Sequence, residues 1–343
     1  MVKKEFKIAL IGCGALANTM HGSAIQKYVE RHPGTIFAAC CDIDETRART
    51  FAEKFNIPAY YTCIDTMLDM EKPHAVNLIA PEALTAELSC KILDKGYPLL
   101  LEKPPGLTGV ETRCMMFAAA DTPNMVAFNR RYMSVVHNAT IYLGDWCASD
   151  KNNRILSINY KMLRHNRTDP NFATTAIHGI DLVSFLAMAP YKKVNFRYQN
   201  LPHIGETVAN FFLDCEMEYG IMANLSFLPI SHIDIERVEI NTTGGLLCLE
   251  LPMWAGCHDG NGKITMYKNN KTEWERDGAA ISESIAGVSE DYVNGGFYLE
   301  NHIFYNNVRN KTHQSEIYGI ESGLQAVEIA ECIVNRQVCY EQK

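Results

Sequence analysis

The first 127 residues alternate short apolar runs with segments of helical periodicity, and this pattern constrains the fold more than any other feature. The apolar runs are Phe6–Gly12, Ile36–Asp42, Ala75–Ala80, Pro98–Glu102 and Met125–Asn129. The segments between them are Ala15–Val29, Glu45–Phe55, Pro81–Asp94 and Thr108–Ala120. Near-continuous apolar strands that alternate with helices indicate a parallel sheet covered on both faces. The pattern therefore predicts a doubly wound α/β domain over residues 1–128.

After Asn129 the pattern changes, because strand-like runs now follow one another directly. They are Ile155–Tyr160, Val194–Tyr198, Thr207–Phe212, Ile221–Phe227, Arg237–Asn241 and Leu246–Leu251. One helix is expected among them, around Thr174–Met188, and the chain becomes helical again at Leu299–Val308 and Gly319–Asn335. Runs of strands with few helices predict a second, α+β domain over residues 129–314 with a large, mostly antiparallel sheet.

A glycine motif joins the first strand to the first helix. Gly12-Cys13-Gly14-Ala15-Leu16-Ala17 has the form G-x-G-x-x-A. Gly12 permits a tight turn, Gly14 lets a pyrophosphate approach the backbone, and Ala17 lets helix and strand pack closely. The free N–H groups and the dipole of the helix N-terminus favour the phosphates. The context predicts a Rossmann domain that binds a dinucleotide.

Asp42 ends the second predicted strand and bears on the choice of dinucleotide. Its carboxylate would accept hydrogen bonds from the adenosine ribose and would repel a 2′-phosphate, so NAD is expected rather than NADP. The alternative is that Asp42 is a turn residue that caps the helix beginning near Glu45.

Composition excludes other classes of protein. The net charge of −8 argues against nucleic acid as a partner, which requires a clustered basic surface. No run of about 18 apolar residues exists, so no membrane partner is expected, and the N-terminus lacks the pattern of a signal peptide. We therefore expect a cytoplasmic protein. The 12 cysteines are scattered without a CxxC pair, which predicts reduced thiols and no metal site.

At Leu101-Glu102-Lys103-Pro104-Pro105 the sequence resembles the Gfo/Idh/MocA oxidoreductases, which carry an E-K-P tripeptide at the end of the fifth Rossmann strand. Further agreements are His21, Pro81, Phe128-Asn129-Arg130-Arg131 and His178-Gly179-Ile180-Asp181. The resemblance implies an open antiparallel sheet, a C-terminal helix of about residues 315–343 that packs back on the first domain, and a homo-oligomer, dimer or tetramer, formed through the C-terminal sheet. It also implies a small carbohydrate-like substrate.

The resemblance assigns roles to individual residues. It places Lys103 beside the nicotinamide and the substrate, and it makes His178 the acid/base. This chemistry suits the oxidation of an alcohol, which needs a base for the hydroxyl proton and a cation for the developing alkoxide. The expected cofactor-binding residues are Gly12, Gly14, Ala15, Leu16, Asp42, Ile43, Ala80, Pro81, Glu102 and Lys103. The expected substrate-binding residues are Lys103, Arg131, Tyr160, Thr174 and His178, with Arg164, His165 and Trp254 as weaker candidates.

The chain departs from the family pattern in front of the histidine. Thr174 stands where relatives commonly carry an aspartate one helical turn before His178, and a hydroxyl stabilises an imidazolium less than a carboxylate does. Asp181 is a candidate catalytic residue that would replace this carboxylate; the alternative is a packing role. After Pro81, Glu82 and Thr85 replace the asparagine and histidine of many relatives.

Three functions follow from these residues. The first is an NAD-dependent dehydrogenase that oxidises a hydroxyl of a sugar, cyclic polyol or glycoside. The second is an NAD-dependent glycosidase that works by transient oxidation at C3, elimination and re-reduction. The third is a non-catalytic NAD-binding sensor, against which the presence of both Lys103 and His178 argues.

Overall fold

The computed structural model describes residues 5–253, 260–312 and 314–342. The chain divides into two compact units. Unit 1 comprises Met1–Ala127 and Phe297–Val327, and unit 2 comprises Phe128–Gly296 and Glu328–Lys343. The C-terminal segment thus returns to unit 1 earlier than the expected residue 315, and its last residues belong to unit 2. Among the helices of the described residues, none is both long and apolar enough to span a membrane.

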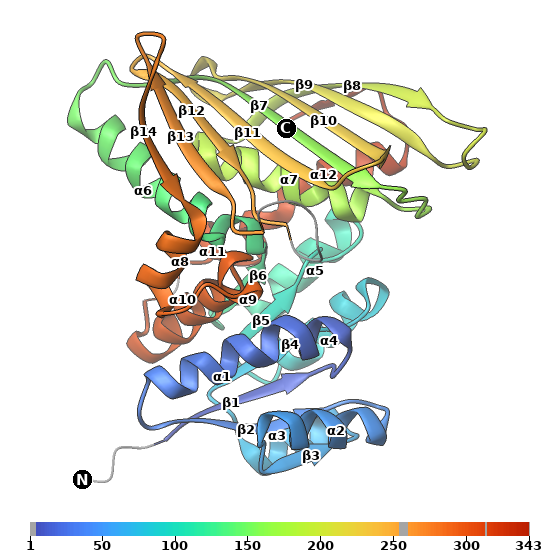
Figure 1. The fold of residues 1–343 in the computed structure, drawn as a ribbon. Coiled ribbons are helices and arrows are strands. Elements are labelled where there is room, and N and C mark those ends of the chain that lie inside the picture. The colour runs from blue at the N-terminus through green and yellow to red at the C-terminus, as the bar shows by residue number, and fades with distance from the viewer. Residues whose placement is uncertain (1–4, 254–259, 313, 343) are drawn as a thin grey trace. The chain divides into compact units, whose positions relative to one another are not determined.

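Unit 1 contains a parallel sheet, which Figure 1 shows with its flanking helices. Within the described residues it has six strands in the order β3-β2-β1-β4-β5-β6, and every neighbouring pair is parallel. The strands are β1 (Phe6–Ile11), β2 (Thr35–Cys41), β3 (Ala59–Tyr61), β4 (Ala75–Leu78), β5 (Leu99–Glu102) and β6 (Asn124–Ala127). Five of them are buried along their length, β4, β5 and β6 at every residue and β1 and β2 at all but one, as strands covered on both faces must be. The predicted doubly wound domain is confirmed.

The helices of unit 1 follow the strands in the expected alternation. The first helical segment starts at Ala15, passes through a π-helical turn, η1 (Ala17–His21), and continues as α1 (Gly22–Arg31). The others are α2 (Glu45–Phe55), α3 (Ile64–Glu71), α4 (Glu82–Leu93), α5 (Gly109–Ala119), α10 (Phe297–Asn310) and α11 (Ser315–Tyr318). Helix α12 (Ile320–Val334) begins in unit 1 and ends in unit 2. Neither β3 nor α3 was expected from the sequence.

Unit 2 contains the second predicted sheet, which is mostly antiparallel. Within the described residues it has nine strands in the order β14-β13-β12-β11-β7-β10-β9-β8-β15, and among its pairs β7 and β10 are parallel. The strands are β7 (Ile155–His165), β8 (Tyr191–Asn200), β9 (Ala209–Met217), β10 (Met222–Ser231), β11 (Ile235–Thr242), β12 (Gly245–Glu250), β13 (Lys263–Lys268), β14 (Lys271–Asp277) and β15 (Cys339–Glu341). Burial alternates along β9 and β11, which shows that one face packs on a core.

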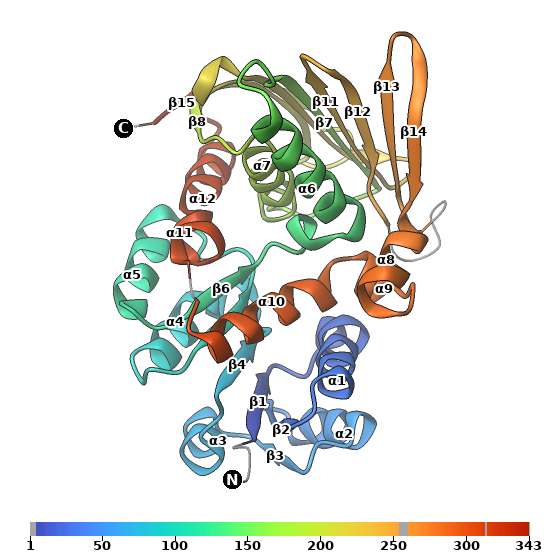
Figure 2. The same cartoon turned by 90° about the vertical axis from the view of Figure 1, so that its left-hand side faces the viewer.

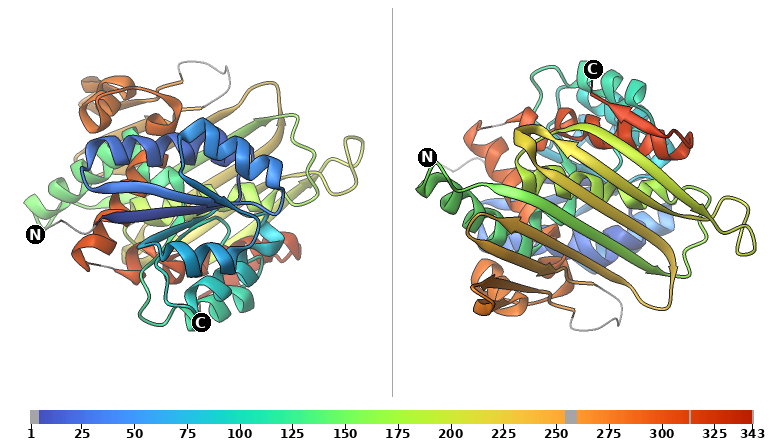
Figure 3. Two further views of the ribbon diagram at one scale, coloured as in Figure 1. Left: turned by 90° about the horizontal axis from the view of Figure 1, so that it is seen from below. Right: turned by 90° about the horizontal axis from the view of Figure 1, so that it is seen from above.

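Helices α6 (Ser134–Ser149) and α7 (Ala173–Ala187) lie on that packed face (Figure 2). The opposite face carries no helix of the described part of unit 2, as the right-hand view of Figure 3 shows. Unit 2 also contains α8 (Gly278–Ala286), α9 (Asp291–Asn294) and the short 3-10 helices η2 (Asn129–Tyr132) and η3 (Glu218–Gly220). Helix α6 was not expected from the sequence, because it contains β-branched and aromatic side chains that favour strands (Val135, Val136, Thr140, Ile141 and Tyr142).

Candidate active site

The two motif glycines differ in whether the protein leaves room for a side chain at their position. Gly12 has a φ of +93°, and a Cβ added to it would lie 2.0 Å from the carbonyl oxygen of Ile79. Only glycine fits such a position. A Cβ added to Gly14 would meet no protein atom within 4 Å. The backbone at Gly14 therefore faces open space, as expected where a ligand approaches it.

Asp42 links the end of β2 to the glycine turn. Its Oδ2 accepts a hydrogen bond from the backbone N–H of Cys13 at 2.8 Å, and its Oδ1 accepts one from the N–H of Asp44 at 2.9 Å. Helix α2 is capped by Asp44, whose Oδ1 accepts from the N–H groups of Thr46 and Arg47 at 2.9 and 3.2 Å. The capping role that was the alternative for Asp42 thus belongs to its neighbour Asp44.

All ten predicted cofactor-binding residues line one cavity of about 570 Å³ within unit 1. They are Gly12, Gly14, Ala15, Leu16, Asp42, Ile43, Ala80, Pro81, Glu102 and Lys103. Sequence reasoning missed others, among them Arg47, Thr62, Ile64, Leu84 and Leu88. Arg47 could have been predicted from the sequence, because it lies in the first turn of the predicted helix that follows Asp42. Thr62 directly follows β3 and Ile64 begins α3. Neither element was expected, so no pattern pointed to these two residues.

The cavity fits a dinucleotide. It opens where the carboxyl ends of the parallel strands meet the N-terminus of the first helix, which is where such folds bind nucleotides. The space at Gly14 accommodates a pyrophosphate, and the Asp42 carboxylate can accept further hydrogen bonds from ribose hydroxyls.

The E-K-P segment brings a lysine to the same cavity. Glu102 is buried at the end of β5, where its Oε1 lies 2.8 Å from Nε2 of the fully buried His21. Its Oε2 accepts a hydrogen bond from the backbone N–H of Lys103 at 3.2 Å. The Lys103–Pro104 peptide bond is cis. His21 ends the π-helical turn η1, so this turn and β5 together fix the backbone from which the Lys103 side chain starts.

Helix α7 of unit 2 carries the predicted base. His178 is 5% exposed, and Thr174 lies one turn before it on the same helix face. The Thr174 hydroxyl donates a hydrogen bond to the carbonyl oxygen of Asn171 at 3.0 Å, so it is used in the first turn of the helix.

Arg131 and Asp181, both predicted site residues, form a buried ion pair within unit 2. The Arg131 Nε donates to Asp181 Oδ2 at 2.8 Å, and a second guanidinium nitrogen contacts Oδ1. The guanidinium carbon lies 5.1 and 5.2 Å from the ring centroids of Phe128 and Phe185. Burial raises the pKa of Asp181, against the opposing charge of Arg131. The pair ties α7 to the segment that follows β6.

Tyr160 and Arg164 contact a second buried carboxylate, Glu236. The Tyr160 hydroxyl donates to Glu236 Oε2 at 2.9 Å, and Arg130 donates to Oε1 at the same distance, while Arg164 also contacts Oε1. Burial, reinforced by the charge of Arg130, lowers the pKa of Arg164 to about 10. His165 is exposed, and Trp254 lies outside the described residues.

The described residues contain no cluster of three or more His, Cys, Asp or Glu side chains that could hold a metal ion.

Comparison with known proteins identifies the N-terminal domain. Residues 6–130 match the family model described as "Oxidoreductase family, NAD-binding Rossmann fold" of the Gfo/Idh/MocA proteins. The predicted cofactor, NAD, and the resemblance to this family are thereby confirmed. Among curated proteins, D-glucoside 3-dehydrogenase of Escherichia coli (strain K12) is 27% identical over 129 residues, which are 38% of this chain and 36% of that protein. The matched stretch thus spans about a third of this curated relative.

Solved structures extend the fold comparison over the whole chain. A Gfo/Idh/MocA family oxidoreductase from Vibrio cholerae has a TM-score of 0.76 at 18% identity and covers 97% of this chain and 98% of its own. A levoglucosan dehydrogenase in complex with NADH and L-sorbose has a TM-score of 0.79 at 18% identity and covers 98% and 99%. The parallel sheet and the mostly antiparallel sheet together are therefore the fold of this family.

Proposed function

We propose that this chain is an NAD-dependent oxidoreductase that oxidises a hydroxyl of a sugar, cyclic polyol or glycoside. The family model supports an oxidoreductase that binds NAD. The names of the similar proteins support the substrate class, since one is a D-glucoside 3-dehydrogenase and another a levoglucosan dehydrogenase. The chemistry needs a hydride acceptor, a base and a cation near the reacting oxygen.

The position of Lys103 is the observation that carries the proposal. Lys103 lines the same cavity as Gly14 and Asp42, at the end of β5. An NAD-binding protein without catalysis would need the glycine turn and the acid but no cation there. In the proposed reaction the Lys103 ammonium stabilises the negative charge that develops on the substrate oxygen.

The base is assigned to His178, following the family pattern. Bound NAD⁺ supplies the acceptor for the hydride of the carbon that carries the hydroxyl. The neutral His178 imidazole accepts the hydroxyl proton, because histidine titrates near neutral pH. Arg131 and Asp181 act as positioning residues, since their buried pair fixes the helix that carries His178.

The test is turnover of the purified full chain on a panel of polyols, monosaccharides and aryl glycosides, with NADH absorbance and aglycone release followed together. We expect NADH to form without release of aglycone. Aglycone release without net NADH would replace the proposal by the glycosidase that works through transient oxidation. NAD binding without either product on the whole panel would leave the non-catalytic sensor.

The Lys103→Ala variant tests the role of the cation. Loss of a group that stabilises charge in the transition state typically costs about 10²–10³-fold in turnover. We expect a loss of this size with NAD binding nearly intact. The control is Lys151→Ala, which removes an exposed lysine of unit 2. Turnover of Lys103→Ala within a few-fold of the parent would remove the lysine from the mechanism.

A further inference from the structure

A second cavity, of about 390 Å³, lies wholly within unit 2. It is bounded by the segment that leads into α7, by the start of β9 and the loop before it, by Pro229 of β10 and by the chain at the end of α12. Its volume is in the range of small-molecule sites, roughly 300–1,000 Å³. It is separate from the cofactor cavity, which is lined by residues of unit 1 alone.

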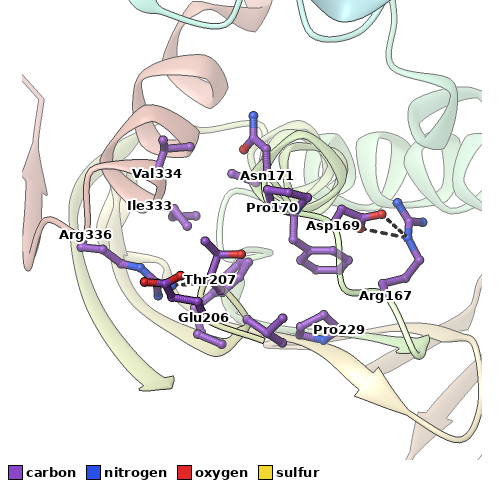
Figure 4. A pocket seen from close by; sticks show the side chains of 15 residues that line it. Arg167, Asp169, Pro170, Asn171, Glu206, Thr207, Pro229, Ile333, Val334 and Arg336 are labelled. Atoms are coloured by element: carbon purple, nitrogen blue, oxygen red, sulfur yellow. Dashed lines mark hydrogen bonds and ion pairs between the residues drawn. The ribbon is translucent and has the colours of Figure 1, made fainter. Parts of the chain in front are cut away.

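Polar groups of both signs stand at opposite ends of this cavity, as Figure 4 shows. At one end Arg336 donates a hydrogen bond to the carbonyl oxygen of Thr207 at 3.0 Å, and its guanidinium carbon lies 5.0 Å from the centroid of the Tyr198 ring. Glu206, the residue before Thr207, supplies a carboxylate at this end. At the other end Arg167 Nε donates to both oxygens of Asp169 at 3.1 and 3.0 Å. Each end therefore offers a positioned donor together with a carboxylate acceptor.

The wall between the two ends is apolar. It is formed by Phe172, Val208, Phe211, Pro229 and Ile333. The rings of Phe172 and Phe211 meet edge to face with centroids 5.8 Å apart, so this wall is fixed by packing.

The charges select the chemical class of the ligand. A simple anion would be repelled by Glu206 and Asp169, and a simple cation by Arg167 and Arg336. A purely apolar ligand would desolvate these groups without giving them hydrogen bonds, which is costly. A neutral ring with several hydroxyls can donate to the carboxylates, accept from the guanidinium groups and lay its C–H face on the apolar wall. A sugar ring has these properties.

The cavity also has a defined relation to the predicted base. Asn171 lines it, and the Thr174 N–H and hydroxyl both donate to the Asn171 carbonyl oxygen, so a hydrogen-bonded turn joins Asn171 to the start of α7. Thr174 and His178 are spaced i and i+4 within α7, which puts them on one side of the helix, and Thr174 is bonded to Asn171 of the cavity wall.

We propose that this cavity binds a second sugar ring, so that the substrate is a glycoside of two or more rings, of which one reacts at His178. The inference rests on the proposed function and names its substrate class. Glu206, which lines the cavity and is exposed, accepts hydrogen bonds from hydroxyls of the second ring.

The experiment is calorimetric titration of the full chain, saturated with NAD, with methyl β-glucoside against cellobiose and methyl α-glucoside against maltose. We expect at least one disaccharide to bind about tenfold more tightly than its methyl glycoside, the gain from about one charged hydrogen bond. Glu206→Gln should abolish this difference and leave the affinity for the methyl glycoside unchanged. The matched control is Glu216→Gln, which alters an exposed carboxylate on β9 that does not line the cavity.

Equal affinities of disaccharide and methyl glycoside in the parent protein, including no binding of either, would overturn the inference. So would a Glu206→Gln variant that keeps the difference or that weakens both sugars alike. Failure of the proposed function is seen in a different measurement, because sugars that bind in the calorimeter would then form no NADH. The two proposals are therefore tested separately.

Discussion

Both carboxylate oxygens of Asp181 are engaged by the guanidinium of Arg131; the pair is buried, and the guanidinium lies over the rings of Phe128 and Phe185. The sequence left two roles open for Asp181, support of His178 or packing. Because both of its oxygens bond to the buried Arg131, the Asp181 carboxylate chiefly balances the charge of that arginine. The arrangement therefore favours a role in holding α7 in place.

Asp181→Asn should accordingly act on stability. Removing one partner of a buried ion pair leaves the other charge uncompensated, so we expect a loss of about 3–5 kcal/mol in the free energy of unfolding. Denaturant titration measures this loss. The double variant Arg131→Met/Asp181→Leu should recover most of it, because no charge is then left buried. A stable Asp181→Asn variant whose pH–rate profile shifts instead would identify Asp181 as the partner of His178.

The two motif glycines provide a matched pair of substitutions. Gly12→Ala should lower the free energy of unfolding by more than about 2 kcal/mol, since a side chain is strained at φ +93° and meets the Ile79 carbonyl. Gly14→Ala should leave the thermal transition unchanged but weaken NAD binding by at least about tenfold, because its methyl group occupies the space for the pyrophosphate. Thermal melts and NADH fluorescence titration distinguish these outcomes. Full NAD affinity in Gly14→Ala would contradict the assigned path of the cofactor.

The preference for NAD over NADP is predicted to depend on Asp42. Asp42→Ser should narrow the affinity gap between the two cofactors by about 1–3 kcal/mol, the range for a hydrogen bond to a charged group. Asp42→Asn removes the charge alone and so separates its effect from that of the turn. Its remaining side-chain oxygen can still accept from the Cys13 N–H and hold the glycine turn. Equal binding of NADH and NADPH by the parent protein would remove the role given to the Asp42 charge.

A pair of histidines makes unit 1 sensitive to acid. Burial, with help from the charges of His32 and Arg31, lowers the pKa of His302 to about 4, and burial also lowers the pKa of His32. These groups take up protons at higher pH in the unfolded chain than in the folded one. Their contribution to stability is therefore present above about pH 6.5 and is lost as the pH falls toward 4.

We expect the thermal midpoint to fall between pH 7 and pH 5 in the parent protein, and to fall less in His302→Gln. A glutamine can keep a hydrogen bond to Asn306, whose amide lies 2.9 Å from His302 Nε2. His203→Gln, in an exposed loop, is the control and should retain the full decline. Equal declines in both variants would show that His302 is not the responsible group.

The cofactor site could be predicted from the sequence because its geometry is local. The turn at Gly12, the acid at Asp42 and the lysine at Lys103 each follow directly from the end of an apolar strand, and parallel strands bring these ends to one edge. What escaped prediction near this site, β3 and α3, has little pattern. Three residues at a sheet edge carry no alternation that could be recognised.

In unit 2 the sequence predicted the class of sheet but not its polar core. Glu236 is paired with Arg130, 106 residues away, and with Arg164, and a pairing over such a distance leaves no local signal. Tyr160 was expected to contact substrate, yet its hydroxyl donates to this same carboxylate. The register that places Tyr160 opposite Val238, two residues from Glu236, is set by the packing of β7 against β11.

Thr174 allows a direct test of His178. Thr174→Asp introduces a negative charge one helical turn from the imidazole and should stabilise its protonated form, which raises the pKa of His178. His178 accepts a proton only when neutral, so the acidic limb of the profile of kcat/KM against pH should move to higher pH. The matched control is Thr174→Asn, because asparagine has nearly the shape of aspartate but carries no charge. It should leave the acidic limb in place. Both are measured on one accepted substrate. Since Thr174 bonds to the Asn171 carbonyl at the start of α7, thermal melts must show that both variants keep the stability of the parent. If the acidic limb does not move in a stable Thr174→Asp protein, then His178 is not the titrating base. The assignment of NAD binding is then unaffected, but the proposed oxidation loses its base.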